Sequence, residues 1–347
     1  MRILVTGNMG YVGPGVVARL RETYPDAEII GIDNGYFGHC LTTLDMFPER
    51  RLSQQWYMDT RDITADQLQD VDAIVHLAAI SNDPMGKAFE EVTADVNHAS
   101  GIALARRARD AGVGSFVFAS SCSVYGFAEG EARNEDSELN PLTAYAHSKI
   151  NTERDTESLA DDDFLVTCLR FPTACGMSDR VRLDLVLNDF VASAVATGKI
   201  TVLSDGSPWR PLIDTKDMAR AIDWGIGRDR DTGGPFVSIN AGRTKWNYRV
   251  KELAEAVQSH MPGVEVDINT NAAPDKRSYR VDFTRYEDLA PDHQPQVDLD
   301  QSIVELKDGL EAIGFGDANF RESHLIRLNM LNDLRSKGLL DEHLRWR

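Results

Sequence analysis

The sequence is poor in cysteine. Its 347 residues hold four thiols, and no two of them form a C-x-x-C pair. This spacing offers no disulfide framework, so we expect Cys40, Cys122, Cys168 and Cys175 to be reduced thiols of a cytoplasmic protein. Cys122 directly follows Ser121, a candidate site residue discussed below. We interpret Cys122 as a small buried side chain rather than as a reactive thiol.

Long apolar runs and positive charge are also scarce. No apolar stretch reaches 18 residues and no signal peptide is recognisable, so we expect no membrane partner. Lysine and arginine number 37 against 55 aspartates and glutamates, and the net charge of −18 argues against nucleic acid as a partner. His39, His98 and His147 are scattered without ligand spacing, so we expect no metal site.

A glycine-rich segment follows the first apolar run. Residues 2–6 predict a buried parallel strand, and the next residues, GNMGYVG, carry Gly7, Gly10 and Gly13. In order, these glycines permit a tight turn, a close approach of backbone to a diphosphate, and close packing of the following helix. The N-terminus of that helix attracts phosphate, provided that Pro14 lies in its first turn.

An acidic residue ends the second apolar run. Residues 28–32 predict a strand, and Asp33 follows about 20 residues after the last glycine of the loop. A carboxylate at this place accepts hydrogen bonds from the ribose hydroxyls of adenosine and repels a 2′-phosphate. Residues 34–38 contain no lysine or arginine. The segment therefore predicts NAD rather than NADP as the cofactor.

Tyr145 and Lys149 are the most informative pair in the chain. If residues 143–160 are helical, the two side chains share one face, one turn apart. To act as a base near neutral pH, the phenol must lower its pKa from about 10 to about 7, which takes about 4 kcal/mol. A cation about 6 Å away supplies roughly 2.8 kcal/mol of this. The charge of an oxidised nicotinamide ring can supply the rest, so the pair predicts a catalytic base that works with a bound cofactor.

Taken together, these motifs resemble the extended short-chain dehydrogenases/reductases, in particular the NAD-dependent nucleotide-sugar epimerases and dehydratases of the UDP-glucose 4-epimerase type. The resemblance covers roughly residues 1–285. The matching segments are GNMGYVG, Asp33, Asp59 in YMDTRDI, His76–Ala79, Asn97 in ADVNHAS, Ser120–Gly126, Tyr145-x-x-x-Lys149, Leu169–Gly176, Asp205–Ala221 and Pro274–Asp282.

The resemblance implies a set of site residues. The catalytic residues are Ser121, Tyr145 and Lys149. The cofactor-binding residues are Gly7, Gly10, Tyr11, Val12, Gly13, Asp33, Asn34, Asp59, Thr60, Leu77, Ala78, Ala79, Asn97, Tyr145, Lys149 and Phe171. The substrate-binding residues are Ser81, Ser121, Ser123, Thr173, Arg182, Arg210 and Arg277. Thr173 departs from the family, which commonly has asparagine there.

Strand-like and helical stretches alternate along the chain and predict an α/β fold. The expected strands are 2–6, 28–32, 72–77, 115–120 and 164–169, and the expected helices between them include 92–111 and 143–160. We predict a Rossmann-type, doubly wound parallel sheet with a smaller C-terminal substrate-binding lobe. The NAD-binding domain is placed at residues 1–172, completed by later segments, and the lobe with the C-terminal helices at 173–347.

Further elements are expected in the second half. Helices are predicted near 182–197, 215–227 and 247–260, and strands near 199–203 and 235–239. The stretch 324–338 has leucines near helical spacing, and we expect it to pack on its own subunit rather than to form an interface. The resemblance also implies a homodimer held by the helices 92–111 and 143–160.

The resemblance implies a mechanism with several outcomes. Tyr145 removes a proton from a sugar hydroxyl bound by Ser121, Lys149 lowers the phenol pKa, and NAD oxidises the sugar to a ketosugar. The related dehydratases carry Asp-Glu after the active-site Ser or Thr, where this chain has Cys122 and Ser123. An epimerase, acting at C4, is therefore expected first, and a ketosugar reductase or dehydrogenase second. A 4,6-dehydratase and a non-catalytic dinucleotide-binding protein rank behind them.

The substrate predicted in this way is a nucleoside-diphosphate sugar. Because the protein is acidic overall, such an anion needs a local cationic pocket. Arginine suits phosphate oxygens because its guanidinium forms two parallel hydrogen bonds. Candidate cations are Arg182, Arg210, Lys276, Arg277 and Arg280.

Overall fold

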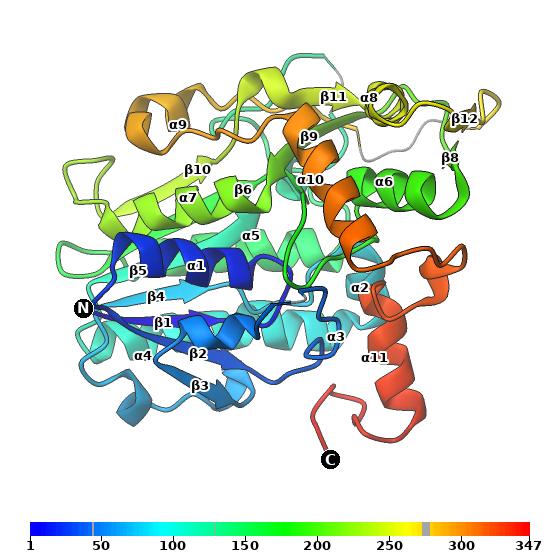
Figure 1. Cartoon of the computed structure of the whole chain (residues 1–347). Coiled ribbons are helices and arrows are strands. Elements are labelled where there is room, and N and C mark those ends of the chain that lie inside the picture. Colours follow the sequence, from blue (N-terminus) through cyan, green and yellow to red (C-terminus); the bar gives the residue numbers. More distant parts are fainter. Residues whose placement is uncertain (44, 129, 273–277) are drawn as a thin grey trace.

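The computed structural model describes residues 1–43, 45–128, 130–272 and 278–347. Its largest element is a seven-stranded sheet with the strand order β10-β6-β5-β4-β1-β2-β3, in which every pairing is parallel (Figure 1). The α/β fold with a doubly wound parallel sheet is therefore confirmed. Its strands are β1 (Arg2–Thr6), β2 (Glu28–Asp33), β3 (Gln54–Tyr57), β4 (Ala73–His76), β5 (Ser115–Ser121), β6 (Leu165–Phe171) and β10 (Phe236–Asn240).

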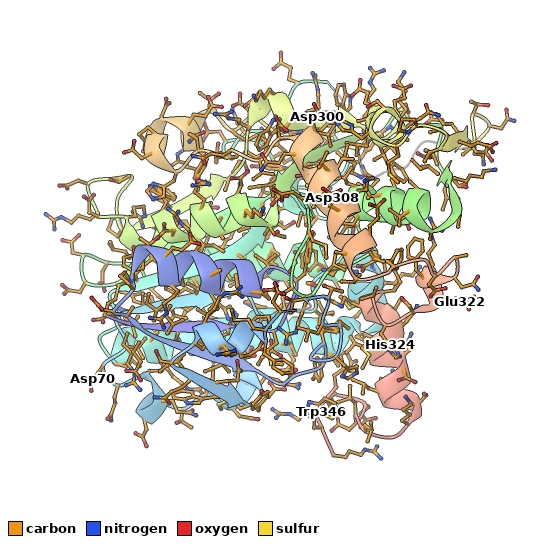
Figure 2. The ribbon with its side chains drawn as sticks, in the orientation of Figure 1. Asp70, Asp300, Asp308, Glu322, His324 and Trp346 are labelled. Atoms are coloured by element: carbon orange, nitrogen blue, oxygen red, sulfur yellow. The ribbon has the colours of Figure 1, made fainter. Side chains whose placement is uncertain are left out.

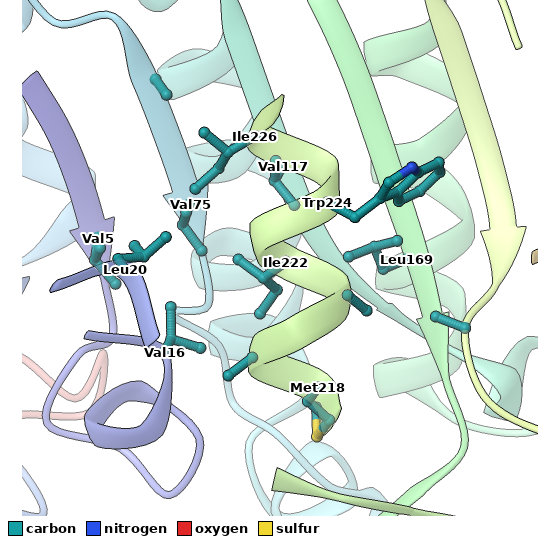
Figure 3. Close-up of a cluster of buried hydrophobic side chains, with 14 of the residues drawn as sticks. Val5, Val16, Leu20, Val75, Val117, Leu169, Met218, Ile222, Trp224 and Ile226 are labelled. Atoms are coloured by element: carbon teal, nitrogen blue, oxygen red, sulfur yellow. The ribbon is translucent and has the colours of Figure 1, made fainter. Parts of the chain in front are cut away.

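Helices cover both faces of this sheet, which explains why its central strands are apolar throughout. One face packs against α1 (Gly13–Thr23) and α7 (Thr215–Gly227), where Ile222 and Trp224 of α7 lie over Val117 and Leu169 (Figure 3). The other face packs against α4 (Ser100–Asp110) and α5 (Ala144–Glu157). The sheet is thus held rigidly, and the loops at its carboxyl ends are held with it.

A smaller layer lies beside the sheet and has its own apolar core. It contains a three-stranded sheet in the order β11-β9-β7 and a parallel pair, β8 and β12. Its strands are β7 (Thr173–Cys175), β8 (Lys199–Val202), β9 (Trp209–Asp214), β11 (Asn247–Arg249) and β12 (Glu265–Ile268), and its main helices are α6 (Val186–Thr197), α8 (Val250–His260) and α10 (Leu299–Ala312).

The remaining helices are short, apart from one near the C-terminus. They are α2 (Asp83–Ala88), α3 (Glu90–Thr93), α9 (Thr284–Leu289) and α11 (Arg327–Ser336). Helix α11 contacts α2, and its Leu331 and Leu334 are buried in a cluster with Met85 and Phe89. The expectation that this stretch packs on its own subunit is confirmed.

The predicted elements of the second half are present, with two shifted boundaries. The helix expected from residue 247 begins at Val250, because Asn247–Arg249 form β11. The helix expected from residue 182 begins at Val186, and three of the residues just before it, Arg182, Asp184 and Leu185, line a cavity. The helix expected at 92–111 is continuous from Glu90 to Asp110, but residues Ala94–Ala99 form a π-helical turn. Such turns are frequent at functional sites.

The large sheet takes a strand from the second half of the chain. Strand β10 pairs with β6, and α7, also from the second half, covers the sheet next to α1. This arrangement is what an NAD-binding domain completed by later segments requires, and the division between residues 172 and 173 remains our proposal. In the part of the chain that the structure describes, no helix is both long and apolar enough to span a membrane.

Candidate active site

A cavity of about 950 Å³ opens at the carboxyl ends of β1, β2, β4, β5 and β6. This is where ligands bind in open parallel sheets. Nearly all the predicted site residues line it. The exceptions are Asn97, which lies behind the wall, the candidate cation Arg280, and Lys276 and Arg277, which fall outside the described residues.

The glycine loop forms one wall and leaves no room for side chains. Gly7 has a φ of +74°, and a Cβ there would lie 2.7 Å from the backbone nitrogen of Ala78. A Cβ on Gly13 would lie 2.3 Å from the carbonyl oxygen of Asn8. Pro14 is the second residue of α1, so its missing N–H costs little. The loop fits the diphosphate of a dinucleotide, held at the N-terminus of α1.

Asp33 and its neighbours form the next part of the wall. The carboxylate of Asp33 accepts hydrogen bonds from the backbone nitrogens of Met9 (3.1 Å) and Gly35 (2.7 Å). Burial raises the pKa of this carboxyl group, while the two backbone hydrogen bonds lower it. The two oxygens retain further lone pairs for ribose hydroxyls.

The other predicted cofactor residues lie along the ends of the strands. Asp59 forms an ion pair with Arg61 (2.7 Å), which holds the pKa of Asp59 below its usual range despite burial. Several of the predicted residues form a continuous part of the wall between the adenosine end and the tyrosine: Asn34, Asp59, Thr60, Leu77, Ala78, Ala79 and Phe171.

Asn97 has a different position from the one expected. It is fully buried, its amide nitrogen donates to the carbonyl oxygen of Ile80 (3.0 Å), and its amide oxygen accepts from the backbone nitrogen of Ile80 (2.8 Å). It also donates to Ser148 of α5 (3.1 Å). Asn97 lies in the π-helical turn Ala94–Ala99. From there it holds the loop after β4 against α5, the helix that carries Tyr145.

Ser121 and Tyr145 meet at the floor of the cavity. Ser121 ends β5, and Tyr145 lies in the first turn of α5, which Thr143 caps by accepting from the backbone nitrogen of Ala146 (3.1 Å). Burial raises the pKa of Tyr145 to about 12, and a hydrogen bond with Ser121 lowers it. Asp83 raises the same pKa through its charge, and Arg182 lowers it. The protein alone therefore holds the phenol protonated.

Lys149 lies under the tyrosine as the sequence predicts. Its ammonium nitrogen is 5.4 Å from the centre of the Tyr145 ring and 4.6 Å from that of Phe118. It donates to the carbonyl oxygen of Ala119 (2.7 Å). Burial lowers the pKa of Lys149 to about 8, against the charge of Glu153, which raises it.

The other predicted substrate residues also line the cavity. Arg182 is buried, forms an ion pair with Asp184 (2.8 Å) and donates to the hydroxyl of Ser81 (2.9 Å). The hydroxyl oxygen of Ser123 is buried without a hydrogen-bond partner, which suits contact with a ligand. Thr173 and Arg210 line the cavity from β7 and β9.

The structure explains the positions of two further residues that the sequence singled out, Arg280 and Cys122. Arg280 is not part of the described cavity wall, because its guanidinium stacks over Trp209 (5.3 Å) and donates to the carbonyl oxygen of Gly130 (2.5 Å). Cys122 is fully buried and donates to the carbonyl oxygen of Arg170 (3.2 Å), and burial raises the pKa of its thiol. This thiol is the buried packing residue that we expected.

Sequence patterns missed several residues of the wall. Asp83 belongs to none of the sequence motifs. Its carboxylate nevertheless accepts a hydrogen bond from the hydroxyl of Thr143 (2.7 Å), and its charge acts on Tyr145. Tyr279 is buried, lines the cavity and lies in the segment 274–282 that matches the family. Arg327 reaches the cavity from α11, in the part of the chain that resembles the family least.

In the described part of the chain, no three histidine, cysteine or acidic side chains lie close enough together to hold a metal ion. A ring nitrogen of His98 is hydrogen-bonded to the carboxylate of Asp155 (2.7 Å), and His147 is exposed on α5. Both act as surface groups in this structure.

Comparisons with known proteins place the chain among sugar-nucleotide enzymes. The profile of the NAD-dependent epimerase/dehydratase family matches residues 3–242. A Bacillus subtilis protein, the uncharacterized UDP-glucose epimerase YtcB, is 28% identical over 74% of this chain and 82% of its own length. A UDP-glucose 4-epimerase of Lactobacillus helveticus is 29% identical over 65% of this chain and 68% of its own.

Solved structures show the same fold. A UDP-glucose-4-epimerase from Stenotrophomonas maltophila, with bound NAD and formylated UDP-arabinopyranose, superposes with a TM-score of 0.75. It is 22% identical and covers 90% of this chain and 99% of its own.

Proposed function

The chain belongs to the NAD-dependent epimerase/dehydratase family, and from that premise we propose that it inverts one carbon of a nucleoside-diphosphate sugar by transient oxidation. As a member of this family the protein is an enzyme that uses NAD. We propose UDP as the nucleotide and C4 as the carbon, because the two relatives described above are a UDP-glucose epimerase and a UDP-glucose 4-epimerase.

The observation that carries the proposal is the set Ser121, Tyr145 and Lys149 on one cavity wall, with a buried thiol where dehydratases have an acid. Cys122 is directed into the core and its pKa is raised, so it cannot exchange protons with a sugar. The remaining residues serve proton transfer at a single hydroxyl group, as an epimerase requires.

The chain's residues divide the work as follows. Ser121 holds the reacting hydroxyl of the sugar and the phenol of Tyr145 in one hydrogen-bonded chain. Tyr145 takes the hydroxyl proton when the sugar is oxidised and returns it when the ketosugar is reduced, so it is base first and acid second. Bound NAD supplies the acceptor and donor of the hydride.

Lys149 adjusts the tyrosine. Its ammonium group stabilises a phenolate 5.4 Å away, measured to the ring centre, more than it stabilises a neutral phenol. Because the isolated site raises the Tyr145 pKa to about 12, the positive charge of the oxidised cofactor is needed in addition. We therefore propose that the base is active only in the presence of NAD.

The substrate side is proposed on charge and position. Arg210 on β9 and Arg182 are assigned to the diphosphate as candidate cations, and Ser81, Ser123 and Thr173 are assigned to the rest of the substrate. Arg277 keeps its proposed role from the sequence alone. Asp33 is assigned to the adenosine ribose, where its charge disfavours NADP.

The proposal is tested by supplying UDP-glucose and analysing the products of wild type, Tyr145→Phe and Tyr57→Phe. We expect an epimerised nucleotide sugar without accumulating NADH, a loss of at least ~100-fold in Tyr145→Phe, and normal rates in Tyr57→Phe. Tyr57 is an exposed tyrosine on β3 and controls for the substitution itself. A ketosugar formed together with stoichiometric NADH contradicts the proposal in favour of a dehydrogenase.

A further inference from the structure

Three buried arginines lie close together beside the cavity, and two of them, Arg182 and Arg327, line it. Arg180 and Arg327 are each 1% exposed, and Arg182 is 6% exposed. Buried cations in proteins are normally paired with acids or bound to ligands, because an isolated buried charge costs several kcal/mol. Each of the three should therefore have an anionic partner.

Two of the arginines have such a partner. Arg180 forms a bidentate ion pair with Glu49, at 2.7 and 3.2 Å. Arg182 forms a bidentate pair with Asp184, at 2.9 and 2.8 Å.

Arg327 has no such partner in the described part of the chain. One guanidinium nitrogen, Nη2, donates to the carbonyl oxygen of Arg180 (2.7 Å), and the planar group lies 4.9 Å from the ring centre of Phe37. The other terminal nitrogen, Nη1, is buried without any hydrogen-bond partner. Burial and the charges of Arg182 and Arg180 lower the pKa of Arg327 to about 10, although Cys40 and the charge of Asp184, which is paired with Arg182, raise it. The site around Arg327 thus lacks one anion.

The position of Arg327 identifies the end of the cavity that it serves. Phe37, under its guanidinium, lines the cavity four residues after Asp33. Arg180, whose carbonyl it binds, carries a charge that acts on Asp33. Because the charges of Arg182 and Asp184 also act on it, Arg327 lies where the loop after Asp33 meets the segment 180–184, at the end of the sheet where α11 is seen in Figure 1.

The other cations of the described wall are already committed. Lys149 is beside Tyr145, Arg210 belongs to the smaller lobe, and Arg321 forms an ion pair with Asp189 (2.7 Å). The glycine loop GNMGYVG itself contains no lysine or arginine. A diphosphate at the N-terminus of α1 would otherwise be neutralised only by backbone N–H groups.

We propose that Arg327 is a diphosphate-binding residue of the NAD site, supplied by the C-terminal helix α11. Its guanidinium offers Nη1 to a phosphate oxygen while Nη2 remains anchored on the carbonyl oxygen of Arg180. Phe37 keeps the guanidinium plane in place from below. The inference rests on the NAD dependence of the family and is independent of which reaction follows.

The nucleotide sugar also carries a diphosphate, so the experiment separates the two sources. NAD, ADP-ribose and UDP are titrated calorimetrically into nucleotide-free protein, for wild type, Arg327→Met, Arg327→Lys and Arg335→Met. Arg335 lies two turns further along α11, is exposed and does not line the cavity, so it controls for the loss of one charge from this helix.

We expect Arg327→Met to bind NAD and ADP-ribose at least ~10-fold more weakly and to bind UDP within twofold of wild type. Arg327→Lys keeps the charge but lacks the forked guanidinium, so its NAD affinity should lie between those of wild type and Arg327→Met. The NAD affinity of Arg335→Met should match that of wild type. The melting temperature of nucleotide-free Arg327→Met should equal or exceed that of wild type, because an unpaired buried charge is removed.

Other outcomes overturn the proposal. Unchanged NAD affinity together with a lower melting temperature would make Arg327 a purely structural anchor for α11. A loss of UDP affinity as large as that of NAD would assign the residue to the substrate. Because no turnover is measured, a failure here leaves the epimerase proposal standing, and a failure of the epimerase test leaves this one standing.

Discussion

Single charges around Tyr145 determine how the proposed base works. Its pKa is raised to about 12, mainly by burial and also by the charge of Asp83, whereas Ser121 and Arg182 act to lower it. None of these effects follows from the spacing of Tyr145 and Lys149 alone. The pair identified the proposed base, but Asp83 reaches it only through the fold, from α2.

Replacing Asp83 should shift the pH dependence of the reaction. The negative charge of Asp83 raises the Tyr145 pKa, so Asp83→Asn lowers it, and the rise in kcat/KM with pH moves to lower pH by on the order of one unit. Asparagine can still accept the hydrogen bond from Thr143 that caps α5 against α2.

Asp231→Asn provides the control, since Asp231 is an exposed loop residue. It should leave the pH profile of the wild type unchanged. A profile of Asp83→Asn that stays in place, or that moves to higher pH, would mean that Tyr145 is not the group that titrates.

At the scale of elements, strong local patterns predicted most of the fold and special environments account for the misses. Strands β1, β2, β4, β5 and β6 are apolar runs, and each lies within one or two residues of its expected bounds. Strand β3 was missed, since its sequence QQWY lacks such a run and it forms the edge of the sheet. Strands β7, β11 and β12 of the smaller layer, three or four residues long, were missed as well. Helix α6 starts later than expected, after bends at residues 183–185.

The C-terminal tail is the element that sequence patterns explained least. The indole nitrogen of Trp346, labelled in Figure 2, donates to the carbonyl oxygen of Asn34 (2.7 Å), and the hydroxyl of Tyr36 donates to the carbonyl oxygen of Leu344. Asn34 and Tyr36 both line the cavity directly after Asp33. The tail therefore braces the loop that we assign to adenosine.

Trp346→Ala should weaken NAD binding by about 3- to 10-fold, because the loop loses one hydrogen bond and the packing of an aromatic ring on Tyr36 (5.9 Å between ring centres). Titration calorimetry measures this directly. Leu339→Ala changes an exposed side chain of the same tail and should bind NAD as wild type does. Equal affinities in both variants would show that the tail does not support the loop.

For the whole molecule, we propose a homodimer through α4 and α5, as the resemblance implies. In the described chain none of the large exposed hydrophobic side chains lies on these two helices, and the face carries His147, Arg154 and the His98–Asp155 pair. The contact would therefore be polar and sensitive to salt.

Light scattering at micromolar concentration and low salt should give about 77 kDa, twice the chain mass of 38.5 kDa. The mass should fall towards that of one chain as the salt concentration rises. A monomer under all these conditions would refute the proposed assembly.

The overall reaction is best tested with a nucleotide sugar deuterated at the carbon that is oxidised, first UDP-glucose labelled at C4, with mass spectrometry of the product. The proposed epimerase returns the same hydrogen to the opposite face, so the inverted sugar should keep its deuterium and no NADH should accumulate. Loss of the label from the inverted sugar, or its appearance in released NADH with a ketosugar as the product, would contradict the proposed function.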